Sequence, residues 1–328
     1  MRISLVLGSG GARGWAHIGI IEEVERRGHT IVSISGASMG ALVGGVYGTG
    51  KLPEVAQWAA SLTRTDMVRL VDPALGSAGI VRGQKVLKKI EEIAGSARIE
   101  ELSIPFTAVA TDLLSQREIW FQSGPLYPAI RASISIPMIF TPVLMGDRLL
   151  ADGGLVNPVP VEPTLAQVSD ATIAVNLYGH PDAHPRDRLR EAIEAEKEGS
   201  ALARSINKGV NALTDNELFH KISRYFEEPQ KEESGQITEP GNPEAGKDPH
   251  ANWGPGKLPP GISTWQVADM SMTTMQELIY RYRAASNPVS ATIDIPIDKV
   301  GTLEFYRAEE MMDYGRKLAA EALDELES

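Results

Sequence analysis

Hydrophobic residues follow two different spacings along this chain. Short runs rich in β-branched residues at positions 3–7, 30–34 and 171–177 are typical of buried strands. Between the first two runs, apolar residues recur at helical spacing and predict a helix over residues 15–27. A strand, a helix and a second strand in so short a span indicate parallel pairing through a right-handed crossover.

The same two spacings predict most of the remaining elements. Helices are expected over residues 41–47, 53–62, 84–94, 126–133, 264–284 and 305–323. Two further strands, over residues 105–111 and 117–122, flank the short loop 112–116. This arrangement is typical of an antiparallel hairpin.

The predicted helix over residues 264–284 carries an apolar stripe. Its members are Trp265, Ala268, Met272, Met275, Ile279 and Tyr282. Helices that face a core and helices that face lipid share this spacing. We expect the stripe to face the core, and contact with lipid is the alternative hypothesis.

The composition changes after residue 177. Residues 186–208 are charged and helical in pattern, whereas residues 227–261 are rich in Pro, Gly, Glu and Lys and poor in apolar residues. Such a segment buries too little apolar surface to fold, so it is expected to be disordered or a loose excursion from the domain. We therefore expect a core over residues 1–178, a helical excursion over 179–226, a low-complexity insert over 227–262, and C-terminal helices over 263–328 that complete the domain.

Composition and charge exclude several classes of function. The chain has no cysteine, which removes disulfides, thiolate nucleophiles and cysteine-bound zinc. Its formal net charge of -11, without a concentrated basic patch, argues against a nucleic-acid partner. The chain has no apolar run of membrane-spanning length and no signal-peptide pattern at its start, so we expect a cytoplasmic protein.

A serine lies between two glycines where a predicted strand meets a predicted helix, in the motif Gly36-x-Ser38-x-Gly40. This pattern is typical of a nucleophile elbow, in which the turn is so tight that only glycine fits beside the serine. The hydroxyl then lies at a helix N-terminus, where unpaired amides and the helix dipole favour developing negative charge. The alternative is a turn that merely connects the two elements.

A glycine-rich loop over residues 8–14 follows the first strand. It fails as a dinucleotide-binding fingerprint, because Arg13 stands where the third glycine would be needed and no acidic residue ends the second strand. Nucleotide binding is therefore disfavoured. The loop still presents successive backbone N–H groups at a helix N-terminus, which suits an oxyanion.

A second short motif is Asp152-Gly153-Gly154, which follows an apolar run over residues 148–151. By itself, an Asp-Gly pair predicts a hairpin turn. A serine hydroxyl, however, is a weak nucleophile until a positioned base accepts its proton. Asp152 is the candidate for that base.

Together these motifs resemble those of a known family, the patatin-like phospholipases, and most closely their prokaryotic branch related to neuropathy target esterase. The residues that carry the resemblance are Gly10, Gly11, Arg13 and Gly14, Gly36-x-Ser38-x-Gly40, and Asp152-Gly153-Gly154. Residues 131–137 fit the helix and proline turn found between elbow and aspartate, and residues 303–310 are also similar. The resemblance covers residues 1–177 and resumes from 264.

The resemblance implies a three-layer α/β/α sandwich with a mainly parallel central sheet, and a serine–aspartate dyad. Ser38 would be the nucleophile, Asp152 the base, and the backbone N–H groups of Gly10, Gly11 and Arg13 the oxyanion hole. The supporting glycines would be Gly14, Gly36, Gly40, Gly153 and Gly154. The expected substrates are lipid or acyl esters, with no metal or organic cofactor, and contact with a membrane surface stays a hypothesis.

Two positions depart from the family pattern. Gly8 stands where many members have aspartate, and Ser9 replaces the first glycine of the loop. The family assigns no chemistry to either side chain. We therefore expect a changed loop detail and retained activity.

Three competing hypotheses stay open on the sequence. An α/β-hydrolase with a Ser-Asp-His triad would use the same elbow and one of four late histidines, His180, His184, His220 or His250. Against this hypothesis, the glycine-rich loop and the elbow follow the first two predicted strands here, which is too early for the α/β-hydrolase architecture. His17 is expected to be packed or to cap a helix, and His29 to lie in a surface turn. A catalytically silent lipid-binding module of the same fold is the second hypothesis, and a nucleotide-binding protein is the third.

Overall fold

The structure is a computed structural model that describes residues 1–70, 83–182 and 264–328. The chain divides into two compact units, Met1–Asp182 with Ser271–Ser328, and Ala183–Met270. The fold and the site belong to the first unit. The predicted insert over 227–262, and the predicted excursion from residue 183 on, lie outside the described residues.

Eight strands of the described residues form one sheet. They are β1 (Arg2–Leu7), β2 (Thr30–Ala37), β3 (Phe106–Asp112), β4 (Arg117–Phe121), β5 (Val143–Met145), β6 (Arg148–Asp152), β7 (Ala171–Gly179) and β8 (Ala291–Pro296). Their order is β5-β6-β3-β2-β1-β7-β8, with β4 paired to β3. The β3–β2–β1–β7–β8 ladders are parallel, and the ladders of β4, β5 and β6 are antiparallel. The mainly parallel sheet and the β3–β4 hairpin are as the sequence predicts.

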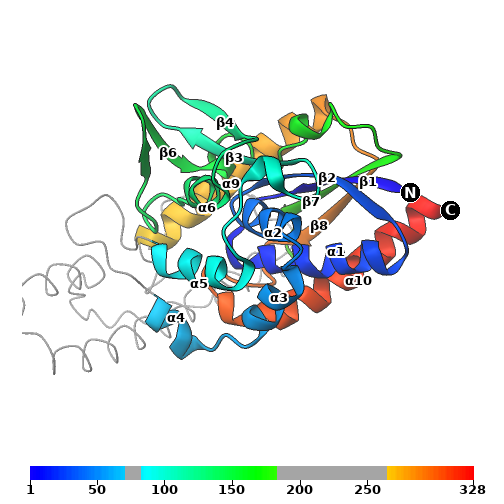
Figure 1. Ribbon diagram of the computed structural model, residues 1–328, viewed down its shortest axis with the longest axis horizontal. Coiled ribbons are helices and arrows are strands. Elements are labelled where there is room, and N and C mark those ends of the chain that lie inside the picture. Colours follow the sequence, from blue (N-terminus) through cyan, green and yellow to red (C-terminus); the bar gives the residue numbers. More distant parts are fainter. Residues whose placement is uncertain (71–82, 183–263) are drawn as a thin grey trace, which may run out of the picture. The chain divides into compact units, whose positions relative to one another are not determined.

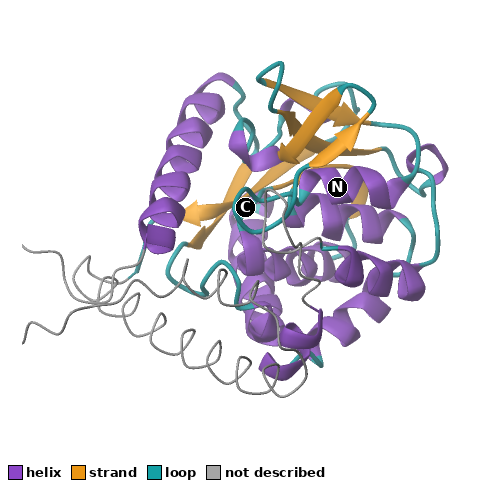
Figure 2. Ribbon diagram, turned by 90° about the vertical axis from the view of Figure 1, so that its left-hand side faces the viewer, coloured by secondary structure: helices purple, strands orange, loops and turns teal. Residues whose placement is uncertain are grey.

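Helices cover both faces of this sheet. They are α1 (Ala16–Arg26), α2 (Met39–Gly48), α3 (Leu52–Ala60), α4 (Arg64–Leu70), α5 (Gln84–Ala94), α6 (Leu126–Ser133), α9 (Thr264–Ser286) and α10 (Ala308–Glu327), with short 3-10 turns η1 (Gly11–Trp15), η2 (Ile99–Glu101), η3 (Gly153–Leu155), η4 (Glu162–Thr164) and η5 (Phe305–Arg307). In Figure 2 the strands separate one long helix from most of the others. The layers are those of an α/β/α sandwich.

Alternation along β1 explains why both faces are buried. Leu5 and Leu7 belong to the large core that includes residues of α1, α2 and α10. Val6 points to the other face, where it clusters with Val159 and Ala174 and where Tyr280 of α9 packs. Successive side chains of a strand point to opposite faces of the sheet. Because both faces are buried here, the sequence of β1 is a nearly continuous apolar run.

Helices α1 and α10 lie side by side on one face (Figure 1). Their closeness depends on two glycines. A Cβ at Gly19 would overlap the carbonyl oxygen of Met312, and a Cβ at Gly315 would overlap that of Ala16. The C-terminal helix therefore completes the core begun by the first helix.

Strand β3 has two partners along one edge. β2 pairs with residues 106–109 of β3 and β6 with residues 110–112, whereas β4 pairs with residues 108–112. Because a strand has only two edges, β2 and β6 must lie end to end on the same one. The end of β2, which leads into Ser38, therefore meets the end of β6, which carries Asp152.

The sequence pattern missed two elements, and its expectation for α9 is wrong in part. The sequence pattern did not predict α4 and β5, which are short and carry little periodicity. The apolar stripe of α9 does not face the core throughout, because Met275 is 62% exposed and Tyr282 is 71% exposed, whereas Gln276 is buried. Helix α9 therefore turns a polar side chain inward at this point. Among the described residues, no helix combines the length and hydropathy that crossing a bilayer requires.

Candidate active site

Ser38 lies in the turn between β2 and α2 with a backbone conformation that non-glycine residues rarely adopt, φ 54° and ψ -121°. The turn is tight because a Cβ at Gly36 would overlap the backbone of Gly40, and a Cβ at Gly40 would overlap the carbonyl oxygen of Leu7. Backbone strain of this kind is typical of functional sites. Ser38 is 2% exposed and occupies the N-cap position of α2.

The glycine-rich loop supplies amide groups beside this turn. Gly11 has φ 58°, and a side chain there would collide with the carbonyl group of Thr302. The Ala12 amide donates to that same carbonyl at 3.0 Å. The amides of Gly10 and Gly11, in contrast, have no acceptor among the described residues. They are therefore available to an incoming anion.

Asp152 ends β6 and begins the turn η3. Its Oδ1 accepts the Gly154 amide at 2.7 Å, so this oxygen is held in place. Its main chain is also fixed, because the amide donates to the Ser135 carbonyl at 2.9 Å and the carbonyl accepts the Thr111 hydroxyl at 2.8 Å. Oδ2 is buried and has no hydrogen-bond partner within the described residues. The turn is a 3-10 turn, so the hairpin alternative for Asp152-Gly153-Gly154 is wrong.

Glycine contacts bring the three motifs together. Gly14 of the loop packs against Met39, the residue after the elbow serine. Gly153 packs against Val109 and Ala37. Gly154 packs against Ser9. Loop, elbow and aspartate turn therefore touch one another in pairs, although 142 positions separate Gly10 from Asp152.

Burial raises the pKa of the Asp152 carboxyl to about 7. The Ser38 hydroxyl and the Gly154 amide oppose this shift, because both favour the charged form. Ser38 thus lies near enough to influence the carboxylate, yet no hydrogen bond joins it to Oδ2. The direct contact of about 2.6 to 3.2 Å that a dyad needs stays a prediction.

The described histidines lie outside this arrangement. His17 is fully buried, contacts the Gly8 carbonyl at 2.8 Å, and has its pKa lowered to about 4 by burial, so it is packed and neutral as expected. His29 contacts Glu327 at 2.7 Å and the N-terminal amino group of Met1 at 3.2 Å, and so links the two ends of the chain. His180 is exposed just after β7. His184, His220 and His250 lie outside the described residues.

Sequence reasoning missed several side chains that support the site. The Arg13 side chain, considered only for its amide, is 3% exposed and donates to the Leu177 carbonyl at 3.0 Å and the Val300 carbonyl at 3.1 Å. Ser9 contacts the Tyr178 hydroxyl at 2.8 Å. These contacts tie the glycine-rich loop to β7 and to the segment after β8. Only the position of Arg13 inside a glycine run hinted at such a role.

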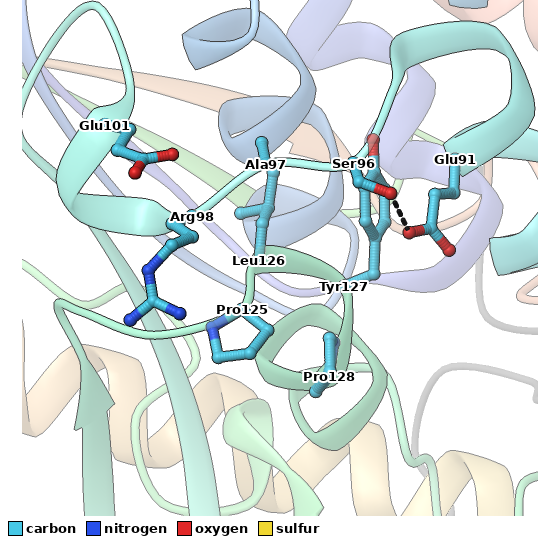
Figure 3. A pocket seen from close by; sticks show the side chains of 9 residues that line it. All are labelled: Glu91, Ser96, Ala97, Arg98, Glu101, Pro125, Leu126, Tyr127 and Pro128. Atoms are coloured by element: carbon cyan, nitrogen blue, oxygen red, sulfur yellow. Dashed lines mark hydrogen bonds between the residues drawn. The ribbon is translucent and has the colours of Figure 1, made fainter.

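A surface pocket of about 430 Å³ lies away from the three motifs. Figure 3 shows its lining, which comes from α5, the segment after it and the start of α6. Arg98, Glu101 and Leu126 are part of its lining. None of the predicted site residues lines it, so we do not assign it to the catalytic site. Within the described ranges, no cluster of three acidic or histidine side chains could hold a metal ion.

Comparison with known proteins identifies the class to which this fold and site belong. The family model of patatin-like phospholipases matches residues 5–165, which include all three motifs. An uncharacterised NTE family protein of Mycobacterium tuberculosis is 40% identical over 337 aligned positions, which cover 99% of this chain and 92% of that protein. The chain therefore belongs to the patatin-like phospholipase family, together with the NTE family proteins, as its motifs predict.

More distant relatives carry names that state an activity. The lysophospholipase NTE1 of Mycosarcoma maydis is 34% identical over 194 positions, or 57% of this chain and 10% of that protein. The neuropathy target esterase sws of Drosophila persimilis is 32% identical over 165 positions, or 48% of this chain and 11% of that protein. Family membership thus supports hydrolysis of lipids as the general activity.

Proposed function

We propose that this protein is a serine acyl hydrolase that cleaves carboxyl esters of lipids through Ser38 and Asp152. One observation carries the proposal: Asp152 Oδ2 is buried without a hydrogen-bond partner among the described residues, near the hydroxyl of a serine held in a strained turn. A buried carboxylate oxygen is costly to leave unpaired, and a catalytic role explains why it is retained.

The reaction follows from these positions. Asp152 Oδ2 accepts the Ser38 proton while Oγ attacks the acyl carbonyl. The amides of Gly10, Gly11 and Arg13, with the N-terminus of α2, stabilise the oxyanion that forms on the carbonyl oxygen. The protonated Asp152 then returns the proton to the leaving alcohol. A water molecule, deprotonated by Asp152, then attacks the acyl carbonyl; the Ser38 Oγ–acyl bond breaks, Asp152 returns the proton to Oγ, and the acyl group leaves as a carboxylic acid.

The raised pKa suits this role. A general base works best when its pKa lies near the working pH, because it must both ionise and accept a proton. An ordinary aspartate is too weak a base, whereas the buried carboxyl of Asp152 has a pKa of about 7. The same burial that disfavours the charged form therefore strengthens the base.

The substrate class rests on the family. The patatin-like phospholipase match and the lysophospholipase and esterase relatives all favour acyl esters of lipids. Selection between a phospholipid, a lysophospholipid and an acylglycerol depends on the shape of the acyl and head-group pockets. We propose peripheral contact with lipid surfaces and no cofactor.

An ester panel tests the proposal. Wild type and Ser38→Ala would be assayed on phosphatidylcholine, lysophosphatidylcholine, diacylglycerol and a short p-nitrophenyl ester, and both would be treated with a fluorophosphonate probe. We expect turnover of at least one lipid ester and a probe adduct on the Ser38 peptide, with both lost in Ser38→Ala. Residual turnover above about 1% would rule out Ser38 as nucleophile. Lipid binding without turnover or labelling would favour a silent binding module.

A further inference from the structure

Ser133, at the last position of α6, joins the elbow to the central sheet. It is fully buried, and its hydroxyl makes two hydrogen bonds at once. It donates to the Val109 carbonyl at 2.6 Å and accepts the Ser38 amide at 2.9 Å. A single hydroxyl therefore links the backbone of the elbow serine to Val109 in the middle of β3.

The same part of the chain also contacts the aspartate turn. Two residues after Ser133, the Ser135 carbonyl accepts the Asp152 amide at 2.9 Å. The Val109 carbonyl, to which Ser133 donates, is also the group against which Gly153 packs. Helix α6 accordingly contacts α2, β3 and β6. The end of α6 thus touches both partners of the proposed dyad through their main chains.

We propose that Ser133 is a positioning residue that sets the place of Ser38 relative to Asp152. The inference rests on the proposed function and adds a role for a residue outside the three motifs. A positive φ at a non-glycine residue costs energy and persists only where the surroundings over-determine it. The Ser133 hydroxyl is one such constraint, because it holds the Ser38 amide that the strained turn would otherwise leave without a partner.

Removing this hydroxyl should act on the chemical step. In Ser133→Ala the Ser38 amide and the Val109 carbonyl lose a buried partner, so the elbow can relax away from the base. A misplacement of about 1 Å at a reacting group can cost about 10²-fold in rate. Substrate contacts made elsewhere are untouched, so KM should change little.

Ser33 offers a matched control. It is a buried serine at 2% exposure, and its hydroxyl donates to Ser4 Oγ at 2.8 Å within the sheet. Ser33→Ala removes a buried hydroxyl and a hydrogen bond, as Ser133→Ala does, but touches neither the elbow nor the aspartate turn. A general loss of stability would affect both variants alike.

The test measures kcat, KM, the rate constant of fluorophosphonate labelling and the thermal midpoint for wild type, Ser133→Ala and Ser33→Ala. We expect kcat and the labelling rate of Ser133→Ala to fall by about 10- to 100-fold with KM within about threefold. Ser33→Ala should stay within about threefold of wild type in both parameters. Equal kcat and labelling rates in the two variants would overturn the proposal.

A second variant covers the case in which Ser133→Ala does not fold. Ser133→Cys keeps the side-chain shape but substitutes a weak donor and acceptor, so a smaller drop in kcat of the same kind is expected. A folded Ser133→Cys with wild-type kcat and labelling would equally overturn the role. Ser38→Ala separates the two hypotheses. If it keeps turnover, the proposed function fails; if it is silent while Ser133→Ala is fully active, only the positioning role fails.

Discussion

The crossing of α1 with α10 and the turn around Ser38 are both places where two backbones meet closely enough to require glycine. At the crossing, Gly19 and Gly315 let carbonyl groups of the opposite helix approach, within a core of apolar side chains. At the turn, Gly36 and Gly40 bring β1, β2 and α2 together. The helix crossing and the turn differ in the chemistry of the groups that surround each close contact.

At the helix crossing, close packing buries the apolar side chains of α1 and α10. Around the elbow, in contrast, polar groups of the neighbouring motifs have no partner within the described residues: the Asp152 Oδ2 atom and the amides of Gly10 and Gly11. Buried polar groups without partners destabilise a fold, so they are typical of sites that use them. We therefore expect substitutions at the crossing to lower stability and substitutions at the elbow to lower activity.

Asp152→Asn should give the largest effect of the variants that sharpen this contrast. Asparagine keeps the size and shape of the side chain but cannot accept the Ser38 proton, so turnover should fall by roughly 10² to 10⁴-fold or more. Turnover of a lipid ester measures the effect on activity, and thermal unfolding of the same sample measures the effect on stability. Wild-type turnover in a folded Asp152→Asn protein would exclude Asp152 as the base.

Gly11→Val should lower turnover by about 10² to 10³-fold, the cost of losing one oxyanion-hole donor. Gly11 has φ 58°, and valine there would collide with Thr302 and turn the amides of the loop away. Steady-state kinetics with a circular dichroism spectrum of the variant test this expectation. A well-folded Gly11→Val enzyme at wild-type rate would contradict the oxyanion role.

The pH profile should follow the ionisation of Asp152. Because its pKa is raised to about 7, kcat/KM should rise with pH up to about 7 and then level, with about a tenfold loss for each pH unit below. Initial rates between pH 5 and pH 9, chosen around that pKa, measure the profile. A rate that stays flat down to pH 5 would disagree with this pKa.

The free energy of unfolding should change with pH in the opposite direction to kcat/KM. Between the ordinary value of 3.8 and about 7, the folded state keeps a proton on Asp152 that the unfolded state releases. The free energy of unfolding of wild type should therefore fall as pH rises through this window, relative to Asp152→Asn. Denaturant unfolding of both proteins at pH 4 to pH 8 tests it, and a difference that does not depend on pH would count against the raised pKa.

Gly19→Ala tests the other side of the comparison. The added methyl group would overlap the Met312 carbonyl, so the two helices must separate, at a cost of about 1 to 3 kcal/mol in the free energy of unfolding. Turnover per folded molecule should stay within about twofold of wild type. A large loss of kcat with unchanged stability would show that the crossing is coupled to the site.

The histidine variants should have the smallest effect. Alanine at His180, His184, His220 and His250, singly or together, should leave most of the turnover, because the proposed base acts directly on Ser38. The assay is the same lipid-ester turnover. If one replacement silenced the enzyme as fully as Ser38→Ala, a Ser-Asp-His triad would replace the dyad.

Local sequence patterns were sufficient to predict most helices and strands, because periodicity and glycine punctuation are properties of neighbouring residues. They also identified the three motifs, since each is contiguous. The contacts between the motifs depend on the sheet order that places β6 on the same edge of β3 as β2. That order is set by packing across more than a hundred residues, beyond the reach of any local pattern.

The contacts of Ser133 and the orientation of α9 were decided by tertiary structure alone. A serine that ends a helix has no local signal for a bond to an elbow 95 residues earlier. Periodicity likewise reports that α9 has an apolar stripe but not which side meets the sheet, and here Gln276 is buried while Met275 is exposed. Sequence thus determined most of the elements and the candidate reacting groups, whereas the fold decided which groups meet, because partners that are distant in the chain are selected only by packing.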